Sequence, residues 1–247
     1  MSRVYSIVLL MLACAPYILP LKLPDYIKPC KADASLDSCA LKQGDAVIRR
    51  LIHGDPRYRI PDLEPLTITK LVVNQGNNQV GLNITLRNSR IHGLSKAKFV
   101  SSRMNLKTMH AEWDFLVPRL ELVGGYRASG QILILPISGN GLGNITLLNM
   151  NITYKFDYKI EKIKGQDHLK ITSTKLDFDT SRMFVHLENL FNGDRLLGEA
   201  LHRFLDENWR EVVKELGPAV GDAIGSVFKL IFTNIASVVP YKDLFSN

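Results

Sequence analysis

The chain has 247 residues, of which 46% are hydrophobic and 22% charged, and its formal net charge is +7. A chain this apolar can bury a sizeable core, which argues against an intrinsically disordered protein. The positive charge is mild and scattered, without the basic face that nucleic-acid binding needs, so we expect no nucleic-acid partner.

The first twenty residues have the pattern of a secretory signal. A single charge, Arg3, precedes the apolar run 8–13, and residues 13–15 read Ala-Cys-Ala, which fits the small-residue cleavage pattern. A buried N-terminal helix is the alternative interpretation. We expect residues 1–20 to be a signal peptide, residues 21–247 to form a single domain, and the protein to be secreted and extracellular.

Two cysteines follow the expected signal, Cys30 and Cys39. In an oxidising compartment this pair favours one short-loop disulfide bond. A metal site is not expected, because no histidine lies nearby and two thiolates do not complete a tetrahedral site. The six histidines of the chain also lack metal-binding spacing, and nothing in the sequence calls for a cofactor.

Residues 40–53 carry apolar side chains at helical spacing and are followed by Gly54-Asp55-Pro56. This pattern predicts a short amphipathic helix held at its start by the disulfide bond. The segment 60–65 contains two prolines, so we expect it to be extended.

From Leu66 to about Asn189 the apolar period changes to two. Leu82, Ile84 and Leu86 alternate with polar residues, as do the aromatic residues of 154–160. The alternation predicts half-buried strands in a large antiparallel sheet with one apolar face. Turn signals that would join the strands as hairpins occur at Gln75–Asn78, Gly124–Gly125, Ser138–Gly143 and Gly165–Asp167.

Three N-glycosylation sequons begin at Asn83, Asn144 and Asn151. Asn83 and Asn151 fall on the polar phase of their strands, where a glycan would reach water. Asn144 is in the opposite phase to Asn151, so it is exposed only if a turn at Gly141 and Gly143 precedes the strand or a bulge resets the phase.

A second amphipathic helix is predicted from Asp194 to Leu216. Its apolar stripe is Leu197, Leu201, Phe204, Leu205, Val212, Val213 and Leu216. Gly217 and Pro218 then interrupt the pattern, because an interior proline removes an amide donor and clashes with the preceding turn. We expect a kink or a new helix start there.

The segment 220–239 is more apolar, so it must be covered on most of its circumference. A transmembrane span is the alternative, since about 20 apolar residues cross a bilayer. Asp222 and Lys229 would each cost about 2.5–3.5 kcal/mol near the centre of such a span. We therefore expect no stable membrane insertion.

A long antiparallel sheet followed by a long helix predicts an α+β fold in which a highly curved sheet wraps around the helix. Such an interior is difficult to fill with side chains, and an apolar guest in it would be favourable by about 25 cal/mol per Å² removed from water. A fully packed core is the alternative. The candidate ligand-binding residues on apolar phases of the strands and the helix are Leu120, Leu122, Tyr126, Ile132, Ile134, Phe156, Tyr158, Leu201, Phe204 and Leu205.

Two tyrosines of that set, Tyr126 and Tyr158, would supply a polar end that hydrogen-bonds a carbonyl, ester or epoxide. We expect no enzymatic activity. No Gly-x-Ser-x-Gly elbow occurs, and the glycine-rich segment 139–143 lacks the following helix and acid of a nucleotide-binding loop.

An ordered series of short motifs runs through the C-terminal part of the chain. It comprises Phe191-Asn192-Gly193-Asp194, Leu197-Gly198, Phe204-Leu205-Asp206-Glu207-Asn208-Trp209, Pro218, Pro240-Tyr241 and Asp243-Leu244-Phe245. This series resembles the signature of the takeout and juvenile hormone binding protein family of insects. Cys30, Cys39, Pro65-Leu66 and residues 88–94 resemble the N-terminal part of that family.

The chain departs from the pattern of this family in two places. Asp206 stands where asparagine is common, and the chain has no second cysteine pair near its C-terminus. The second departure favours the takeout branch over the hormone binding proteins.

The resemblance implies an elongated domain in which a curved antiparallel sheet wraps a long helix, similar to the lipid-binding modules of bactericidal/permeability-increasing proteins. It also implies a secreted carrier that holds a small hydrophobic ligand, such as a terpenoid hormone, a fatty acid or a related lipid, in an internal apolar tunnel. Such a carrier would be linked to feeding, circadian output or behaviour. We expect a monomer. The alternative is a membrane-surface-active lipid transfer protein that uses the helix after Pro218.

Overall fold

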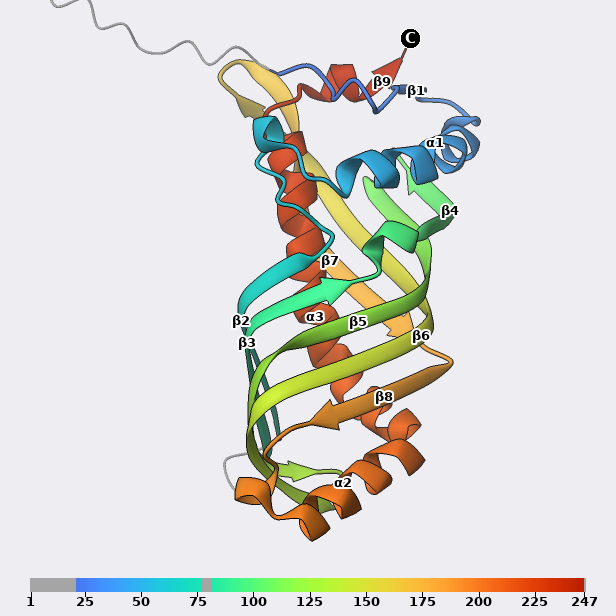
Figure 1. Ribbon diagram of the computed structural model, residues 1–247. Helices are drawn as coiled ribbons and strands as arrows, with labels where there is room; N and C mark the ends of the chain where they lie inside the picture. The colour runs from blue at the N-terminus through green and yellow to red at the C-terminus, as the bar shows by residue number, and fades with distance from the viewer. Residues whose placement is uncertain (1–20, 77–80, 247) are drawn as a thin grey trace, which may run out of the picture.

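A curled antiparallel sheet and one long helix make up most of the molecule (Figure 1). The computed structural model describes residues 21–76 and 81–246. The expected signal peptide, residues 1–20, lies outside the described residues.

The main sheet runs in the order β2 (Leu66–Gly76), β3 (Gly81–His92), β5 (His110–Ile132), β6 (Leu135–Ile163) and β7 (Gln166–Asp179). β4 (Lys98–Asn105) pairs with β5, and β8 (Arg182–Leu187) pairs with β6. All these pairings are antiparallel. In β6, Ile152, Tyr154 and Phe156 are buried, whereas the residues between them are not. The predicted half-buried antiparallel strands are therefore confirmed.

Two of the predicted turns are wrong. Gly124 and Gly125 lie inside β5, and residues 138–143 lie inside β6, where Gly124 pairs with Gly143. Glycine is needed here because the backbones of β5 and β3 lie close together, and not because the chain turns. A Cβ on Gly124 would lie 2.5 Å from Cα of Ser89 on β3.

The hairpin between β5 and β6 instead turns at Leu133, which has φ 52°, and Ile134, two residues that carry no turn signal. The predicted turn at Gly165 is confirmed between β6 and β7. Residues 77 and 78 of the predicted turn Gln75–Asn78 lie outside the described part of the chain.

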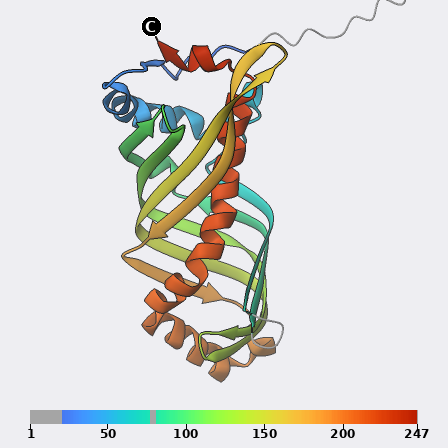
Figure 2. The same ribbon diagram turned by 180° about the vertical axis from the view of Figure 1, so that it is seen from behind.

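The long helix is α3 (Trp209–Ala236), and it follows the shorter α2 (Arg195–Glu207). α3 contacts β7 and also β2 and β8. Seen from behind, it runs along the open side of the curled sheet (Figure 2). The predicted α+β fold, with a curved sheet around a long helix, is confirmed.

A new helix does not start at Gly217 and Pro218, since both residues lie within α3, and the interruption between the two helices is at Asn208. The alternative, a kink at Pro218, stays a prediction. The Asn208 side-chain amide donates to the Phe204 carbonyl at 2.9 Å, which ends α2. Pro218 still forfeits one helical hydrogen bond. Gly217 before it has no Cβ to clash with the proline ring, which makes the continued helix feasible.

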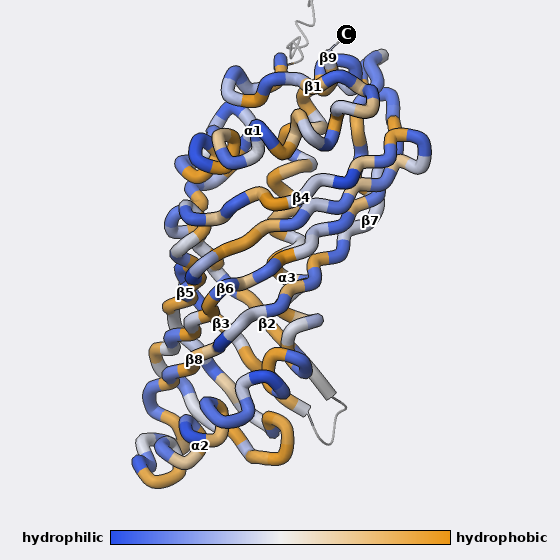
Figure 3. Tube along the Cα trace, turned by 90° about the vertical axis from the view of Figure 1, so that its right-hand side faces the viewer, coloured by the Kyte–Doolittle hydropathy of each residue, from blue (hydrophilic) through white to orange (hydrophobic). Residues whose placement is uncertain are grey.

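Figure 3 shows hydrophilic and hydrophobic segments alternating along the long strands. Among the described residues, α3 is the one helix long and apolar enough to cross a membrane, a test that the core helix of a soluble protein also passes. Buried residues of α3, such as Ile231 and Ile235, belong to the same hydrophobic cluster as the sheet.

The end of the molecule near both described termini is covered by α1 (Leu36–Leu51) and by a parallel pair of short strands, β1 (Cys30–Lys31) and β9 (Phe245–Ser246). The helix predicted at 40–53 is thus confirmed, with an earlier start. Short 3₁₀ helices span Pro56–Tyr58, Leu94–Lys96, Phe191–Gly193 and Tyr241–Leu244.

Two carboxylates tie α1 to the edge strand β4. Oδ1 of Asp45 accepts a hydrogen bond from the Phe99 amide at 2.9 Å, and Oδ1 of Asp37 accepts one from the Met104 amide at 2.9 Å. These bonds satisfy backbone donors that an edge strand would otherwise present to water.

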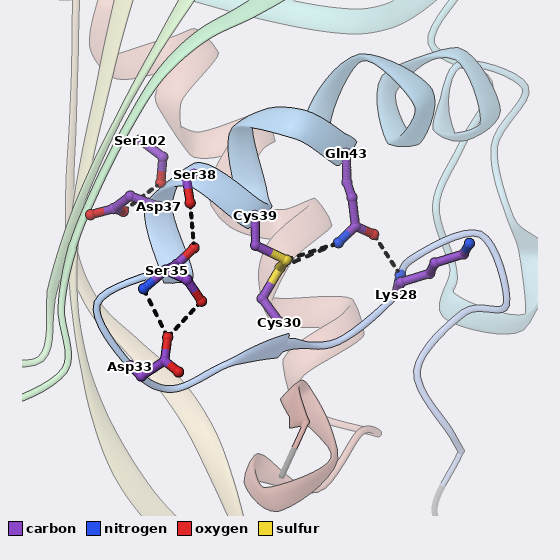
Figure 4. The surroundings of a disulfide bond; sticks show 9 residues. All are labelled: Lys28, Cys30, Asp33, Ser35, Asp37, Ser38, Cys39, Gln43 and Ser102. Atoms are coloured by element: carbon purple, nitrogen blue, oxygen red, sulfur yellow. Dashed lines mark hydrogen bonds between the residues drawn. A yellow bond between two sulfur atoms is a disulfide. The ribbon is translucent and has the colours of Figure 1, made fainter.

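The predicted disulfide bond between Cys30 and Cys39 is confirmed (Figure 4). It links the N-terminal segment to the first turn of α1. The side-chain amide of Gln43 donates to both sulfurs, at 3.1 and 3.3 Å, and its oxygen accepts from the Lys28 backbone amide at 3.2 Å. Gln43 therefore fixes the segment before the disulfide against α1.

Replacing both cysteines, Cys30→Ser with Cys39→Ser, should lower the free energy of unfolding by about 2–3 kcal/mol, because the open chain regains loop entropy. Urea denaturation would measure the loss. Reductant should lower the stability of the wild type to that of the double variant and leave the variant unchanged. Equal stability of the two oxidised proteins would contradict a structural role for the bond.

The sequons differ in their surroundings. Asn83 and Asn151 are exposed, whereas Asn144 is half-buried and its side-chain amide donates to Glu121 at 2.7 Å. Leu147 and Met150 are both buried, with Asn149 between them at φ 47°, so the strand phase does reset ahead of Asn151. Glycosylation at these positions stays a prediction.

At the opposite end of the molecule, α2 covers the edge strand β8. The backbone N–H of Leu187 donates to Nε2 of His202 at 3.0 Å, and the His202 ring stacks on His186 with 5.1 Å between centroids. Only the unprotonated Nε2 can accept this bond. Burial, with a contribution from His186, lowers the pKa of His202 below its usual value near 6.5.

Acidification should therefore destabilise the protein through His202. The unfolded chain takes up the proton as the pH falls below about 6.5, while the folded chain resists it, so stability present above that pH is lost below it. Urea unfolding at pH 7.5 and 5.5 should show a smaller decrease for His202→Gln, whose amide oxygen can accept the Leu187 bond without titrating. An equal decrease in both proteins would exclude this role.

Candidate ligand-binding site

A cavity of about 390 Å³ lies beneath α1, between the curled sheet and the C-terminal half of α3. An engineered cavity of about 150 Å³ in another protein already admits benzene. The volume also falls within the range of about 300–1,000 Å³ that is typical of small-molecule sites.

The cavity walls combine two sequence periods. Alternate residues of β5 point inward, among them Ala111, Trp113 and Phe115, and β6 adds Phe156 and Tyr158. α3 contributes Phe228, Ile231, Phe232 and Ile235, and α1 contributes Leu36, Ala40, Gln43, Val47 and Leu51. Both helical sets have the spacing of a single helix face, so each helix directs one apolar stripe into the cavity.

Aromatic rings form one side of this wall. Trp113 lies 5.0 Å from Phe156 and 5.1 Å from Phe232, measured between ring centroids. Tyr154 lies behind them, 5.7 Å from Phe232 and 5.4 Å from Phe228. Edge-to-face, tilted and stacked pairs at these separations are favourable, so β5, β6 and α3 are held together at the cavity.

Polar groups in the wall are few. Lys28 and Gln43 lie beside the disulfide bond, and Tyr158 contributes a hydroxyl. Burial, together with Tyr241, raises the pKa of Tyr158, so its hydroxyl stays protonated at neutral pH. Among the described lining residues there is no aspartate, glutamate, histidine or serine. The arrangement therefore suits the burial of an apolar molecule, with little to supply acid, base or nucleophile.

Two of the ten residues proposed from sequence, Phe156 and Tyr158, line the cavity. Leu120, Tyr126, Ile132, Leu201 and Leu205 are buried in the core outside its lining, and Leu122 and Phe204 pack against that core. The Tyr126 hydroxyl donates to the Glu188 carbonyl at 2.7 Å. Ile134 is 75% exposed in the turn after β5 and does not face the interior.

Two causes account for the candidates that lie outside the cavity. Leu201, Phe204 and Leu205 were chosen on the expectation that the helix after Asp194 is the central one, but that segment is α2, at the far end of the molecule (Figure 1). Alternation predicts which face of β5 a residue occupies, not where along its 23 residues the cavity lies.

The contribution of α1 was missed, although the spacing of Leu36, Ala40, Val47 and Leu51 was a usable signal. The same holds for the aromatic pair Phe228 and Phe232 of α3. In the described part of the chain, no group of three or more histidine, cysteine, aspartate or glutamate side chains is arranged to hold a metal ion.

The chain is an α+β protein of the class in which one long helix closes a rolled antiparallel sheet. The sheet and the helix enclose an apolar cavity at one end of the molecule. The model of the haemolymph juvenile hormone binding protein family matches residues 7–246. The chain belongs to this family, as the motifs in its sequence predicted.

Individual proteins agree with this assignment. The chain is 24% identical over 232 residues to the circadian clock-controlled protein daywake of Drosophila melanogaster, covering 90% of this chain and 88% of the relative. Daywake of Drosophila yakuba is 23% identical with the same coverage. The crystal structure of Epiphyas postvittana Takeout 1 matches with a TM-score of 0.79 and 26% identity, over 90% of this chain and all 100% of that one.

A lipopolysaccharide binding protein also matches, at 12% identity and a TM-score of 0.33, over 77% of this chain and 38% of that one. A similarity this low carries no weight for the fold. The likeness to bactericidal/permeability-increasing modules therefore stays an expectation from sequence.

Proposed function

We propose that this protein is a secreted carrier that holds one small hydrophobic ligand in the cavity beneath α1. The observation that carries the proposal is the apolar cavity of about 390 Å³ in a chain of this family. Transfer of an apolar guest from water into such a cavity is favourable by about 25 cal/mol for each Å² of surface removed.

The chemical class of the ligand is a terpenoid hormone, a fatty acid or a related lipid. The family is named for binding juvenile hormone in the haemolymph, and the relatives are named as circadian clock-controlled proteins. A role in feeding, circadian or behavioural signalling is part of the proposal. So are a signal peptide at residues 1–20, a single monomeric domain at 21–247, and binding without catalysis.

Ligand extraction tests the carrier function. Protein purified without detergent should release a lipid in stoichiometric amount on organic extraction, detected by mass spectrometry. The delipidated protein should then bind a fluorescent apolar probe, N-phenyl-1-naphthylamine, with saturation at one site. A protein that yields no lipid and takes up no probe would overturn the proposal.

A membrane-surface-active lipid transfer protein is the second candidate, favoured by the length and apolar composition of α3. Co-sedimentation with lipid vesicles separates the two functions. A carrier remains in the supernatant, whereas a protein that inserts α3 into the lipid surface pellets with the vesicles.

A further inference from the structure

Two buried polar atoms have no hydrogen-bond partner within the described part of the chain. They are Nε1 of Trp113 and the hydroxyl of Tyr154. A buried donor without a partner costs free energy, and native proteins keep few of them. Other buried hydroxyls of the protein do have partners, since those of Tyr58 and Tyr126 donate to backbone carbonyls at 2.5 and 2.7 Å.

The two atoms belong to neighbouring side chains. Trp113 on β5 and Tyr154 on β6 are directly opposite each other in the antiparallel register, so their side chains share the inner face of the sheet. Trp113 lines the cavity, and Tyr154 behind it is completely buried. Burial raises the pKa of Tyr154, so its hydroxyl is a donor at neutral pH.

Packing alone does not account for these polar atoms. Phenylalanine is the residue used at positions 115, 156, 228 and 232 of the same aromatic cluster, and it would make ring contacts without burying an unsatisfied donor. The rings that carry these donors both neighbour the ring of Phe232, whose centroid lies 5.1 Å from that of Trp113 and 5.7 Å from that of Tyr154, and Phe232 itself lines the cavity.

We propose that Trp113 and Tyr154 form a paired donor site for the carbonyl oxygen of a neutral ligand, a ketone or an ester, which reaches them by displacing the Phe232 ring. The inference rests on the proposed carrier function and narrows its ligand class. A neutral carbonyl fits better than a carboxylate, because desolvating a charge in an apolar wall is costly without a cation. The cation among the described lining residues, Lys28, is exposed beside the disulfide bond instead.

Matched ligands test the site. Undecan-2-one and dodecane have the same number of non-hydrogen atoms and differ in one carbonyl oxygen. Displacement of N-phenyl-1-naphthylamine measures the affinity of each ligand. If the ketone made only apolar contacts, its affinity would follow from that of dodecane. The wild type should bind the ketone about tenfold more tightly than this, a difference that corresponds to one to two hydrogen bonds. Trp113→Phe and Tyr154→Phe should each reduce the ratio of the affinity for undecan-2-one to the affinity for dodecane several-fold.

The ratio is taken within each variant, so a change in cavity shape affects both ligands and cancels. Tyr58→Phe is the matched control, because it removes a buried hydroxyl that lies outside the cavity lining and donates to the Lys22 carbonyl, so it should leave the ratio unchanged. Equal ratios in the wild type, Trp113→Phe and Tyr154→Phe would overturn the inference.

Nuclear magnetic resonance gives a second measurement on the unmodified protein. The indole N–H signal that disappears in Trp113→Phe should move downfield when undecan-2-one is added and should not do so with dodecane. Binding of both ligands without that shift overturns the donor site and leaves the carrier function standing. If neither ligand displaces the probe, both the donor site and the carrier function are overturned.

Discussion

Replacing Ala40 with tryptophan should reduce the affinity for an apolar guest by roughly 50-fold. Ala40 lies on the inner face of α1 and lines the cavity. An indole there would exclude the guest from about 100 Å² of wall contact, which at about 25 cal/mol per Å² corresponds to about 2.5 kcal/mol. Titration with N-phenyl-1-naphthylamine would measure the loss, and less lipid should co-purify with the variant.

The control is Ala46→Trp on the same helix. Ala46 is exposed and outside the cavity lining, so the same substitution there should leave the affinity unchanged. Thermal unfolding would show whether both variants are folded. Similar affinities of the two variants would place the ligand somewhere other than beneath α1.

Local periods in the sequence predicted the faces of the elements well. The alternation of Ile152, Tyr154 and Phe156 along β6 corresponds to the observed burial. Such patterns depend on neighbours within a few residues, and any fold must bury the apolar face that they create. The disulfide bond between Cys30 and Cys39 was predictable for a similar reason, since the two residues are close in the chain.

Contacts between segments that are far apart in the sequence were not predictable from these periods. Gly124 resembles a turn residue, but it is needed because Ser89 of another strand comes close to it. Leu133 and Ile134 turn the chain without any turn residue, because the pairing of the strands on either side requires a reversal there.

The location of the site depended on the same long-range contacts. Phe156 and Tyr158 were found from the strand phase alone. The role of α1 was not, because it depends on the hydrogen bonds of Asp37 and Asp45 to β4, which bring this helix over the cavity. For the helices, the more apolar segment 220–239 was the local signal that the sheet encloses α3 and not α2.

A row of glycines explains how α3 lies so close to the sheet. Gly217, Gly221 and Gly225 recur every four residues and therefore share one helix face. A Cβ on Gly221 would lie 2.3 Å from the backbone carbonyl oxygen of Leu176 on β7, and a Cβ on Gly225 would lie 3.2 Å from the Leu176 side chain. The absence of side chains at this face lets the helix backbone rest directly on β7.

Gly221→Ala should therefore lower the free energy of unfolding by about 1–3 kcal/mol, because α3 must move away from β7 and the core loosens. The sign of this change in the free energy of unfolding is informative, since alanine stabilises a helix relative to glycine by about 1 kcal/mol where space allows. Gly198→Ala on α2 provides the comparison. A Cβ there would make an ordinary contact of 3.7 Å with Leu190, so this variant should be as stable as the wild type or more stable. Urea denaturation of both variants measures the difference, and a Gly221→Ala protein more stable than the wild type would show that α3 does not rest on β7 at this residue.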